Sequence, residues 1–262
     1  MTAIFLAIAI VAGLGLIAGV GLAIAAIVMH VPVDKTVERL TEAMPGANCG
    51  ACGYSGCAGY AQAIADGAAC NLCIPGGAAT AKVLAGIMGL EDAGEVAERR
   101  ALVRCGGTHE NCKQSFEYRG EQSCAAACLL YSGQKECNYG CLGFGDCLRA
   151  CPEGAISLRD GVAVVDQNRC RGCYLCVKGC PKGIIVMTET RGKAINKCWS
   201  QAAGAVVRRQ CKAGCIGCKL CERNCPEHAV KVENNLAIVD PELCTGCGQC
   251  VAKCPTKCLI MS

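Results

Sequence analysis

Cysteines in the C-terminal half of this chain recur at fixed intervals, and each clustered run is closed by a Cys-Pro pair. The most regular run is Cys170-x2-Cys173-x2-Cys176-x3-Cys180-Pro181. The same intervals return in two later runs, formed by Cys215, Cys218, Cys221 and Cys225 and by Cys244, Cys247, Cys250 and Cys254. Three thiols at successive gaps of two, followed by Cys-Pro, are typical of iron–sulfur ligands. The spacing therefore predicts a protein that transfers electrons.

Composition offers two alternatives to this interpretation, because the chain has 28 cysteines among 262 residues. Disulfide scaffolds are mostly short secreted domains with irregular spacings, and zinc sites usually use paired C-x2-C units, so neither fits well. Aromatic residues make up only 4% of the chain. With so little conventional core, metal binding must supply folding free energy, and the apo-protein is expected to be largely unfolded beyond its N-terminal helix.

The formal net charge of +4 counts every cysteine as neutral. An oxidised four-iron cluster with its four thiolates carries about −2, so about five clusters would shift the charge by about −10. The loaded protein is therefore expected to be acidic, and its formal charge gives no reason to expect nucleic acid as a partner.

An uncharged apolar stretch occupies residues 3–29 and exceeds the roughly 20 residues that span a bilayer. A cleaved signal peptide is the alternative, but no Lys or Arg precedes the stretch. We expect residues 1–30 to form a transmembrane anchor. Lys35 and Arg39 follow it, which places the later domains in the cytoplasm by the positive-inside rule. A reducing compartment also suits a chain with so many thiols.

A separate cysteine group lies in residues 31–104 and predicts an N-terminal iron–sulfur domain. Its spacing is C-x2-C-x4-C-x15-C, which fits a four-iron cluster better than zinc. Cys70 competes with Cys73 for the fourth position, and we prefer Cys73 because the Pro-Gly-Gly turn after it can hold its side chain inward. The expected ligands are Cys49, Cys52, Cys57 and Cys73.

Two tandem copies of a two-cluster fold are predicted downstream, because strand-like runs repeat together with the cysteines. Residues 161–166 precede Cys170 by the same gap that separates residues 235–240 from Cys244. The expected fold class is α+β: a transmembrane helix, a small helical cluster domain and two ferredoxin-like βαββαβ domains. The segments downstream of the N-terminal domain are expected to be a cysteine-containing connector at 105–136, the first copy at 137–190, a basic connector at 191–210 and the second copy at 211–262.

In each copy the fourth thiol of a run is expected to cross over to the neighbouring cluster, as in bacterial ferredoxins. The first set is irregular, since its gaps of three and five residues are wider than in the other runs. The four expected ligand sets are Cys137, Cys141 and Cys147 with Cys180; Cys170, Cys173 and Cys176 with Cys151; Cys215, Cys218 and Cys221 with Cys254; and Cys244, Cys247 and Cys250 with Cys225.

The remaining thiols leave the number of clusters open at five or six. Free buried thiols, which pack as small hydrophobic groups, are one interpretation. The other is a sixth cluster built from Cys105, Cys112 and Cys124 with Cys128, Cys198 or Cys211. The chain has no Walker loop and no dinucleotide fingerprint, so NAD and flavin are expected to bind elsewhere.

The order of these modules resembles a known family. An N-terminal membrane helix, then NCGACGYSGCAGYAQAI and CIPGG, then paired ferredoxin motifs, is similar to the B subunit of the Rnf complex, the ion-translocating ferredoxin:NAD oxidoreductase of bacterial membranes. The resemblance covers nearly the whole chain. It implies a single-pass subunit of the bacterial inner membrane, with its clusters on the cytoplasmic side, that takes electrons from soluble ferredoxin and passes them to membrane partner subunits. A membrane-tethered polyferredoxin serving a hydrogenase or a formate dehydrogenase is the alternative, and the module at residues 46–77 argues against it.

Residues 191–212 contain basic side chains and no acidic one. On an acidic loaded protein, such a segment is expected to attract an acidic ferredoxin electrostatically. The alternative is an ordinary solvated connector between the two copies. The basic residues are Arg191, Lys193, Lys197, Arg208, Arg209 and Lys212.

Overall fold

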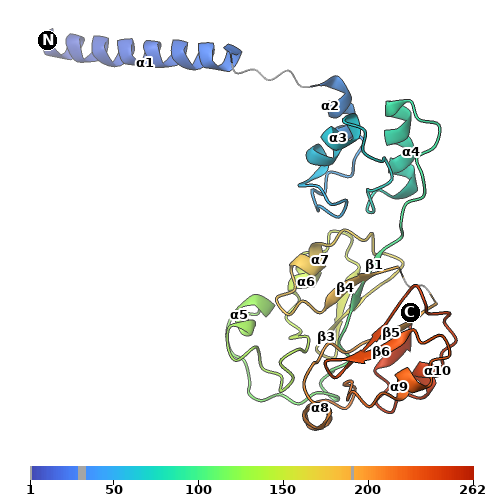
Figure 1. Ribbon diagram of the computed structural model, residues 1–262. Helices are drawn as coiled ribbons and strands as arrows, with labels where there is room; N and C mark the ends of the chain where they lie inside the picture. Colours follow the sequence, from blue (N-terminus) through green and yellow to red (C-terminus); the bar gives the residue numbers. More distant parts are fainter. Residues whose placement is uncertain (1, 29–33, 190–191) are drawn as a thin grey trace.

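The computed structural model describes residues 2–28, 34–189 and 192–262, and within the first range it describes the side chains of Phe5 and of residues 12–25. Figure 1 shows three parts along the chain: a long helix, a small helical module and a larger body built from short strands and helices. Residues 1, 29 and 30 of the expected anchor and Arg191 of the basic segment lie outside the described residues.

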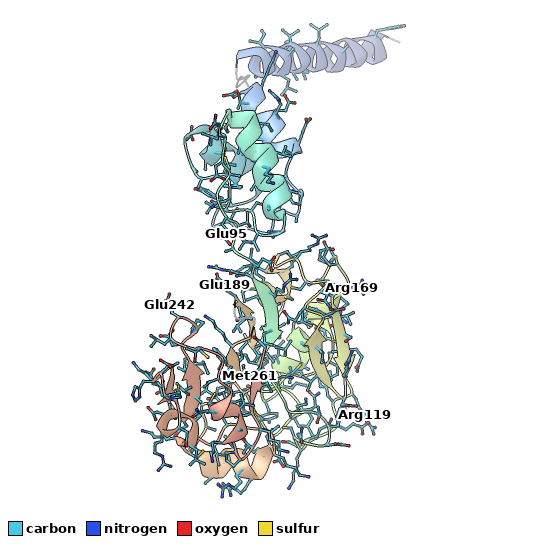
Figure 2. All side chains as sticks on the ribbon, turned by 90° about the vertical axis from the view of Figure 1, so that its right-hand side faces the viewer. Glu95, Arg119, Arg169, Glu189, Glu242 and Met261 are labelled. Atoms are coloured by element: carbon cyan, nitrogen blue, oxygen red, sulfur yellow. The ribbon has the colours of Figure 1, made fainter. Side chains whose placement is uncertain are left out.

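The first part is helix α1, Thr2–Val28, which is rich in the strong helix formers Ala and Leu. Its described large apolar side chains are exposed, Leu16 at 69% and Leu22 at 72%. Figures 1 and 2 show α1 lying apart from the other helices. Within the described part of the chain, no helix combines the length and the apolar character that crossing a membrane requires. The expected transmembrane anchor is therefore not confirmed.

The second part packs three helices around a small apolar core: α2 (Lys35–Glu42), α3 (Cys57–Ala65) and α4 (Gly77–Met88). Leu40, Ile64 and Leu84 are fully buried between them. Tyr60 is also buried, and its hydroxyl donates to the carbonyl of Ala69 at 2.7 Å and accepts from the N–H of Leu72 at 3.0 Å. These two bonds fix the loop that leads to Cys73.

The third part contains two ferredoxin-like copies. In copy one, β1 pairs with β4 and β2 pairs with β3, both antiparallel, and two short helices complete the βαββαβ order. A further helix, α5 (Cys124–Cys128), is inserted between β1 and α6. The elements are β1 (Arg100–Val103), α6 (Asp146–Arg149), β2 (Ile156–Arg159), β3 (Val162–Val165), α7 (Leu175–Lys178) and β4 (Ile185–Thr188).

Copy two repeats the same order, with β5 paired to β8 and β6 paired to β7. Helix α8 (Gly204–Gln210) is inserted after its first strand. The other elements are β5 (Ala194–Asn196), α9 (Leu220–Arg223), β6 (Val230–Glu233), β7 (Leu236–Val239), α10 (Gln249–Ala252) and β8 (Leu259–Met261). The mixed α and β fold with two ferredoxin-like copies is thus confirmed.

The first strand of each copy lies upstream of the boundary that the sequence suggested. β1 falls in the segment expected to close the N-terminal domain, and β5 falls in the expected basic connector. Both strands have only three or four residues, which is too short for a clear alternation of apolar and polar side chains. Residues 105–136 are therefore an insertion within copy one rather than a linker before it.

Buried thiols form much of the core of each copy. In copy one, Ile156 and Ile184 pack with Cys141, Cys147 and Cys176. Copy two has a matching core in which thiols pack with Val230, Leu236 and Leu259. Trp199 packs against both cores and so lies at the junction of the two copies.

Candidate iron–sulfur centres

Four loops with the same backbone geometry carry cysteines in the two ferredoxin-like copies. Each loop contains Cys-x-Gly, and its glycine has a positive φ between 64° and 80°. A Cβ at any of these glycines would lie 2.3–3.0 Å from a backbone oxygen of a neighbouring segment, so only glycine fits. The cysteines that open the four loops are therefore equivalent: Cys141, Cys170, Cys215 and Cys244.

This equivalence shows how copy one departs from the repeat. The residue after the glycine is Cys173, Cys218 or Cys247 in three loops, but it is Phe144 in the fourth. The ring of Phe144 packs against Tyr118, with ring centroids 5.2 Å apart. The first loop thus lacks the second thiol of its motif, which explains why its cysteine gaps looked irregular in the sequence.

A small internal cavity in copy one receives a thiol from outside the repeat. Its lining contains Cys124 together with Cys141, Cys147 and Cys180. Cys137, which the sequence grouped with the last three, lines a different cavity. The structure therefore places Cys124, and not the expected Cys137, beside Cys141, Cys147 and Cys180.

The position of Cys124 follows from the way α5 is fastened to α6. The carboxylate of Asp146 accepts the N–H groups of Cys124 and Ala125, each at 2.9 Å. Asp146 also opens α6, the helix that carries Cys147. The side chain of Asp146 caps α5, and Asp146 is also the first residue of α6. The thiols of Cys124 and Cys147 are therefore brought to the same cavity.

The other three expected ligand sets are each brought together. One cavity is lined by Cys151, Cys170, Cys173 and Cys176, and another by Cys215, Cys218, Cys221 and Cys254. Cys258 also lines the second cavity, with its sulfur 3.6 Å from that of Cys254. In the fourth set, burial raises the pKa of Cys250, and the nearby thiolates of Cys244, Cys225 and Cys247 raise it further. Among the described residues, no three Cys, His, Asp or Glu side chains enclose a site for a single metal ion.

Backbone N–H groups point at sulfur in several of these loops. Ala101 donates to Cys170 at 3.4 Å, Ala155 to Cys151 at 3.4 Å and Ala229 to Cys225 at 3.3 Å. Such bonds stabilise thiolates and tune the potentials of iron–sulfur clusters. Thus the loops provide both the sulfur and the donors that a cluster requires.

The charge balance of these cavities also fits a metal cluster. Burial raises the pKa of Cys147 to about 12, and the neighbouring thiolates of Cys141, Cys124 and Cys180 add to the increase. Burial likewise raises the pKa of Cys176 and of Cys221 to about 11. Several buried thiolates can coexist only if positive charge is placed among them, and iron supplies that charge.

The N-terminal module gathers its expected thiols around Cys73. Burial raises the pKa of Cys73, the N–H of Gly76 lowers it, and the thiolates of Cys52, Cys57 and Cys49 raise it again. Cys70 is buried beside Tyr60, and its pKa is raised by burial alone. The surroundings of Cys73 therefore match the expected fourth position better than those of Cys70.

The module contacts copy one beside the Cys170 loop. The Nζ of Lys178 donates to the carbonyl of Cys49 at 2.6 Å. The thiolate of Cys49 is also among the charges that raise the pKa of Cys173, after burial and the thiolate of Cys151. The two cysteine groups are therefore neighbours across the junction.

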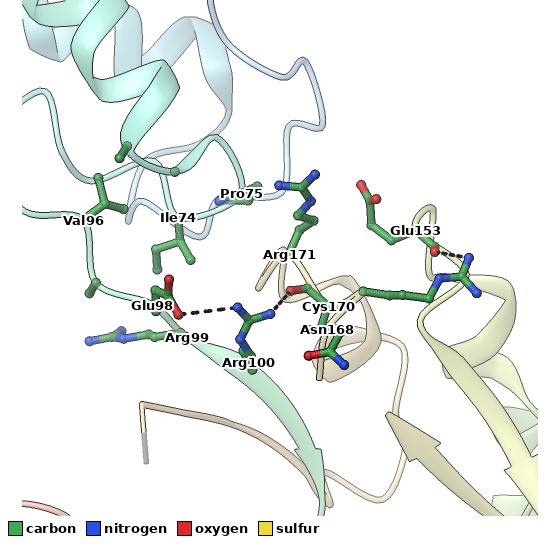
Figure 3. A pocket seen from close by; sticks show the side chains of 14 residues that line it. Ile74, Pro75, Val96, Glu98, Arg99, Arg100, Glu153, Asn168, Cys170 and Arg171 are labelled. Atoms are coloured by element: carbon green, nitrogen blue, oxygen red, sulfur yellow. Dashed lines mark hydrogen bonds and ion pairs between the residues drawn. The ribbon is translucent and has the colours of Figure 1, made fainter. Parts of the chain in front are cut away.

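An open groove of about 530 Å³ lies at this junction, and Figure 3 shows the arginines that line it. Arg100 donates to the carbonyl of Cys170 at 2.9 Å and pairs with Glu98 at 3.4 Å. Arg169 donates to the carbonyl of Glu153 at 2.9 Å. These contacts hold the backbone beside Cys170 and Cys151 in place.

The other thiols that were expected to form a sixth cluster lie in two different places. Cys105, Cys112, Cys198 and Cys211 line one cavity together with Cys137. Cys128 is half-buried on α5 and lines none of the cavities described here. Cys124 thus lies apart from the other thiols that were expected to share a sixth cluster with it.

Most of the basic segment surrounds helix α8. Arg208 and Arg209 lie exposed in its last turn, and Lys212 is exposed just beyond it. Lys193 donates to the carbonyl of Pro241, and Lys197 lines the five-thiol cavity. The exposed charges therefore gather at the end of α8.

Comparison with known proteins agrees with this arrangement. The family model FeS, which describes an Fe-S cluster, matches residues 44–75, and the 4Fe-4S dicluster domain matches residues 136–184 and 214–258. The chain is 43% identical over 261 residues to the B subunit of the Na(+)-translocating ferredoxin:NAD(+) oxidoreductase complex of Acetobacterium woodii, covering 99% of this chain and 78% of that relative. The chain belongs to the family of Rnf complex B subunits.

Two further relatives of the Rnf B family have similar coverage. The B subunit of the proton-translocating ferredoxin:NAD(+) oxidoreductase complex of Clostridium ljungdahlii is 40% identical, covering 98% of this chain and 92% of the relative. The B subunit of the ion-translocating oxidoreductase complex of Methanosarcina acetivorans is 40% identical, covering 95% of each. The Rnf B likeness thus extends through both ferredoxin-like copies.

Proposed function

We propose that this chain is the iron–sulfur electron-transfer subunit of a membrane-bound, ion-translocating ferredoxin:NAD oxidoreductase complex. The observation that carries the proposal is the set of five four-thiol groups, one in the N-terminal module and two in each ferredoxin-like copy. We assign the ligands as predicted from the sequence, except that Cys124 replaces Cys137 beside Cys141, Cys147 and Cys180.

The 4Fe-4S clusters supply one-electron oxidation and reduction when bound. The protein holds them with thiolates, stabilises the thiolates with backbone N–H groups and excludes water by burial. The Cys141 and Cys147 thiols are buried, whereas Cys247 is exposed. Burial and N–H···S bonds set cluster potentials, so these differences favour different potentials along the chain.

The contacts between groups support a continuous route. The Cys49 group lies beside the Cys170 group, as the Lys178 bond to Cys49 shows. Within each copy, the two cysteine groups are linked by the Cys-Pro segments that exchange ligands between them. The route then runs from the ferredoxin-like copies to the N-terminal module, which is nearest in sequence to α1.

We further propose that residues 3–29 attach the subunit to the bacterial cytoplasmic membrane, with the cysteine domains on the cytoplasmic side. The support is the absence of charge over this stretch and the position of Lys35 and Arg39 after it. The partners would be the other membrane subunits of the complex. Purification from membranes together with those neighbours tests the attachment.

The function itself is tested by isolating the whole complex without oxygen. We expect a brown preparation with iron and inorganic sulfide that reduces NAD with reduced ferredoxin as electron donor. Omitting this chain should abolish that activity while leaving the flavin-dependent oxidation of NADH by artificial acceptors. A polyferredoxin serving a hydrogenase or formate dehydrogenase would instead leave ferredoxin-dependent NAD reduction unchanged.

We propose the exposed charges at the end of α8 as the docking surface for soluble ferredoxin, an acidic protein. Changing Arg208, Arg209 and Lys212 to Glu should slow electron uptake from ferredoxin about tenfold at low salt, because electrostatic steering raises association rates by roughly 10- to 1,000-fold. The difference should shrink as salt screens the charges. Stopped-flow oxidation of reduced ferredoxin at several ionic strengths measures it.

A matched control separates local docking from net charge. Lys231, Lys253 and Lys257 are exposed in copy two but lie outside the basic segment. Changing these three to Glu alters the net charge equally and should have a smaller effect on uptake. Equal slowing by both triple variants would assign the effect to net charge and remove the docking surface.

A further inference from the structure

A fifth cavity lies at the junction of the two ferredoxin-like copies, and no ligand set assigned above uses its thiols. Copy one contributes three of them and copy two contributes two. Four are at most 9% exposed, and the fifth, Cys137, is half-buried. The thiols that line the cavity are Cys105, Cys112, Cys137, Cys198 and Cys211.

Two of these thiols face each other across a backbone bridge between the copies. Cys112 and Cys211 form an isolated antiparallel bridge, and their thiols are close enough to influence each other's pKa. The N–H of Lys113 donates to Gln210 at 3.3 Å, and the N–H of Lys212 donates to Asn111 at 2.8 Å. Equivalent bonds thus fasten the two insertions together at this point.

Cys105 and Cys198 form a second matched pair. Cys105 follows β1 and Cys198 follows β5, the first strands of the two copies. The sulfur of Cys105 accepts the N–H of Gly107 at 3.4 Å, and the sulfur of Cys198 accepts the N–H of Ser200 at 3.4 Å. Corresponding elements of both copies therefore direct one sulfur each to the cavity.

The sulfurs converge around Gly107, which is itself part of the lining. A Cβ at this position would lie 3.4 Å from the Cys105 sulfur, 3.7 Å from the Cys211 sulfur and 3.2 Å from the Cβ of Cys112. The N–H of Cys137 also lies close to the Cys112 sulfur. The five thiols are thus one group rather than separate packing residues.

A buried lysine and a partly buried arginine line the same cavity. Lys135 is 2% exposed, and its Nζ donates to the carbonyls of Gly107 at 2.7 Å and Gly161 at 3.0 Å. Arg104 donates to the carbonyl of Asn196 at 3.0 Å. In the described chain, no carboxylate forms an ion pair with either cation. Buried charges require compensation, and thiolates of a metal cluster would provide it.

The cavity lies between one cysteine group of each copy. The N–H of Cys141 donates to the Cys105 sulfur at 3.3 Å. The N–H of Cys215 lies close to the Cys198 sulfur. A cysteine loop of each copy therefore lies beside a thiol of the cavity, which is where the proposed route passes from one copy to the other.

We propose that four of these five thiols hold a sixth four-iron cluster, which relays electrons between the two ferredoxin-like copies. The inference rests on the proposed electron-transfer function. In the relay, one electron arrives from one copy and one electron leaves to the other, so no bond is formed or broken and no atom is transferred.

The test removes Cys112 and Cys211 together, since at most three thiols then remain and a four-thiolate site cannot form. In the full-length chain prepared without oxygen, C112S/C211S should lose about four iron atoms and about four sulfides. Adding C141S/C147S, which breaks the neighbouring site in copy one, should bring the total loss to about eight iron atoms. If the five thiols bind no metal, C112S/C211S contains as much iron per chain as the unchanged protein, and the inference is overturned.

Native mass spectrometry of the unchanged protein gives a result that does not depend on how the variants fold. A mass corresponding to six clusters supports the inference, whereas a fully loaded species with five overturns it. C128S serves as the control for a thiol outside the cavities and should retain all iron. A chain that binds no iron at all would contradict the proposed function itself, so the two failures are distinguishable.

Discussion

Replacing Cys124 with alanine is expected to disrupt one four-iron site in copy one, with the loss of between one and about four iron atoms per chain. The first cluster loop has Phe144 where the three equivalent loops have cysteine, and Cys124 lines its cavity instead. Without Cys124, only three thiols would face that cavity. Iron analysis and electron paramagnetic resonance of the reduced protein measure the change, and ferredoxin-dependent NAD reduction by the complex should fall with it.

Helix α5 offers a matched control for this experiment. Cys128 lies one turn after Cys124 in the same five-residue helix but lines none of the cavities described here. The variant C128A should therefore keep its iron, even though it changes the same residue type in the same helix. A loss of iron from C128A as large as that from C124A would assign the effect to the folding of α5.

A second comparison decides between Cys124 and Cys137. In a C141S/C147S background the site in copy one is already broken, so adding C124A should cost no further iron. Further loss on adding C124A would show that Cys124 belongs to another site. Further loss on adding C137A is compatible with the structure, because Cys137 lines the cavity at the junction of the copies.

Removing iron with a chelator is expected to unfold both ferredoxin-like copies, while the helical signal of α1 persists. The strands have only three or four residues and form two-stranded sheets, which are marginal in water without further packing. The cores of both copies also include several thiols, and chelation removes the metal that these thiols bind. Metal binding to such sites is folding free energy.

Amide hydrogen exchange resolves this expectation by segment. After chelation, protection should disappear from β1 to β8, and it should be partly kept in α2 and α4, which pack through Leu40 and Leu84. Restoring iron and sulfide without oxygen should restore protection. Strand amides that stay protected in the stripped protein would show that the apolar core alone stabilises these copies.

The regular loops could be predicted from the sequence because their ligands lie close together in the chain. Cys170, Cys215 and Cys244 each open a motif whose spacing alone indicates the chemistry. Their loop geometry also repeats in the structure, down to the positive φ of the glycine two residues later. Local spacing was sufficient because local backbone geometry positions these thiols.

The role of Cys124 could not be read from spacing, because tertiary contacts place it. Its helix is held by Asp146, which lies 22 residues later in the chain. A signal was nevertheless present: Cys141-Leu-Gly143-Phe144 aligns with Cys170-Arg-Gly172-Cys173 and shows a missing thiol. For the junction cavity the sequence offered the leftover thiols Cys105, Cys112, Cys198 and Cys211 as candidates, but it could not show that Cys137 joins them in place of Cys124, because the thiols come from both copies and meet only after folding.

Trp199 is the single tryptophan of the chain, and it packs against the cores of both copies beneath the guanidinium of Arg104, which lies 4.4 Å from the ring centroid. Iron–sulfur clusters absorb light at the wavelengths where indole emits, so nearby clusters should quench the fluorescence of this single indole by energy transfer. The molecule therefore contains an intrinsic optical probe at the place where its two halves meet, and emission from it tracks cluster assembly there without any added label.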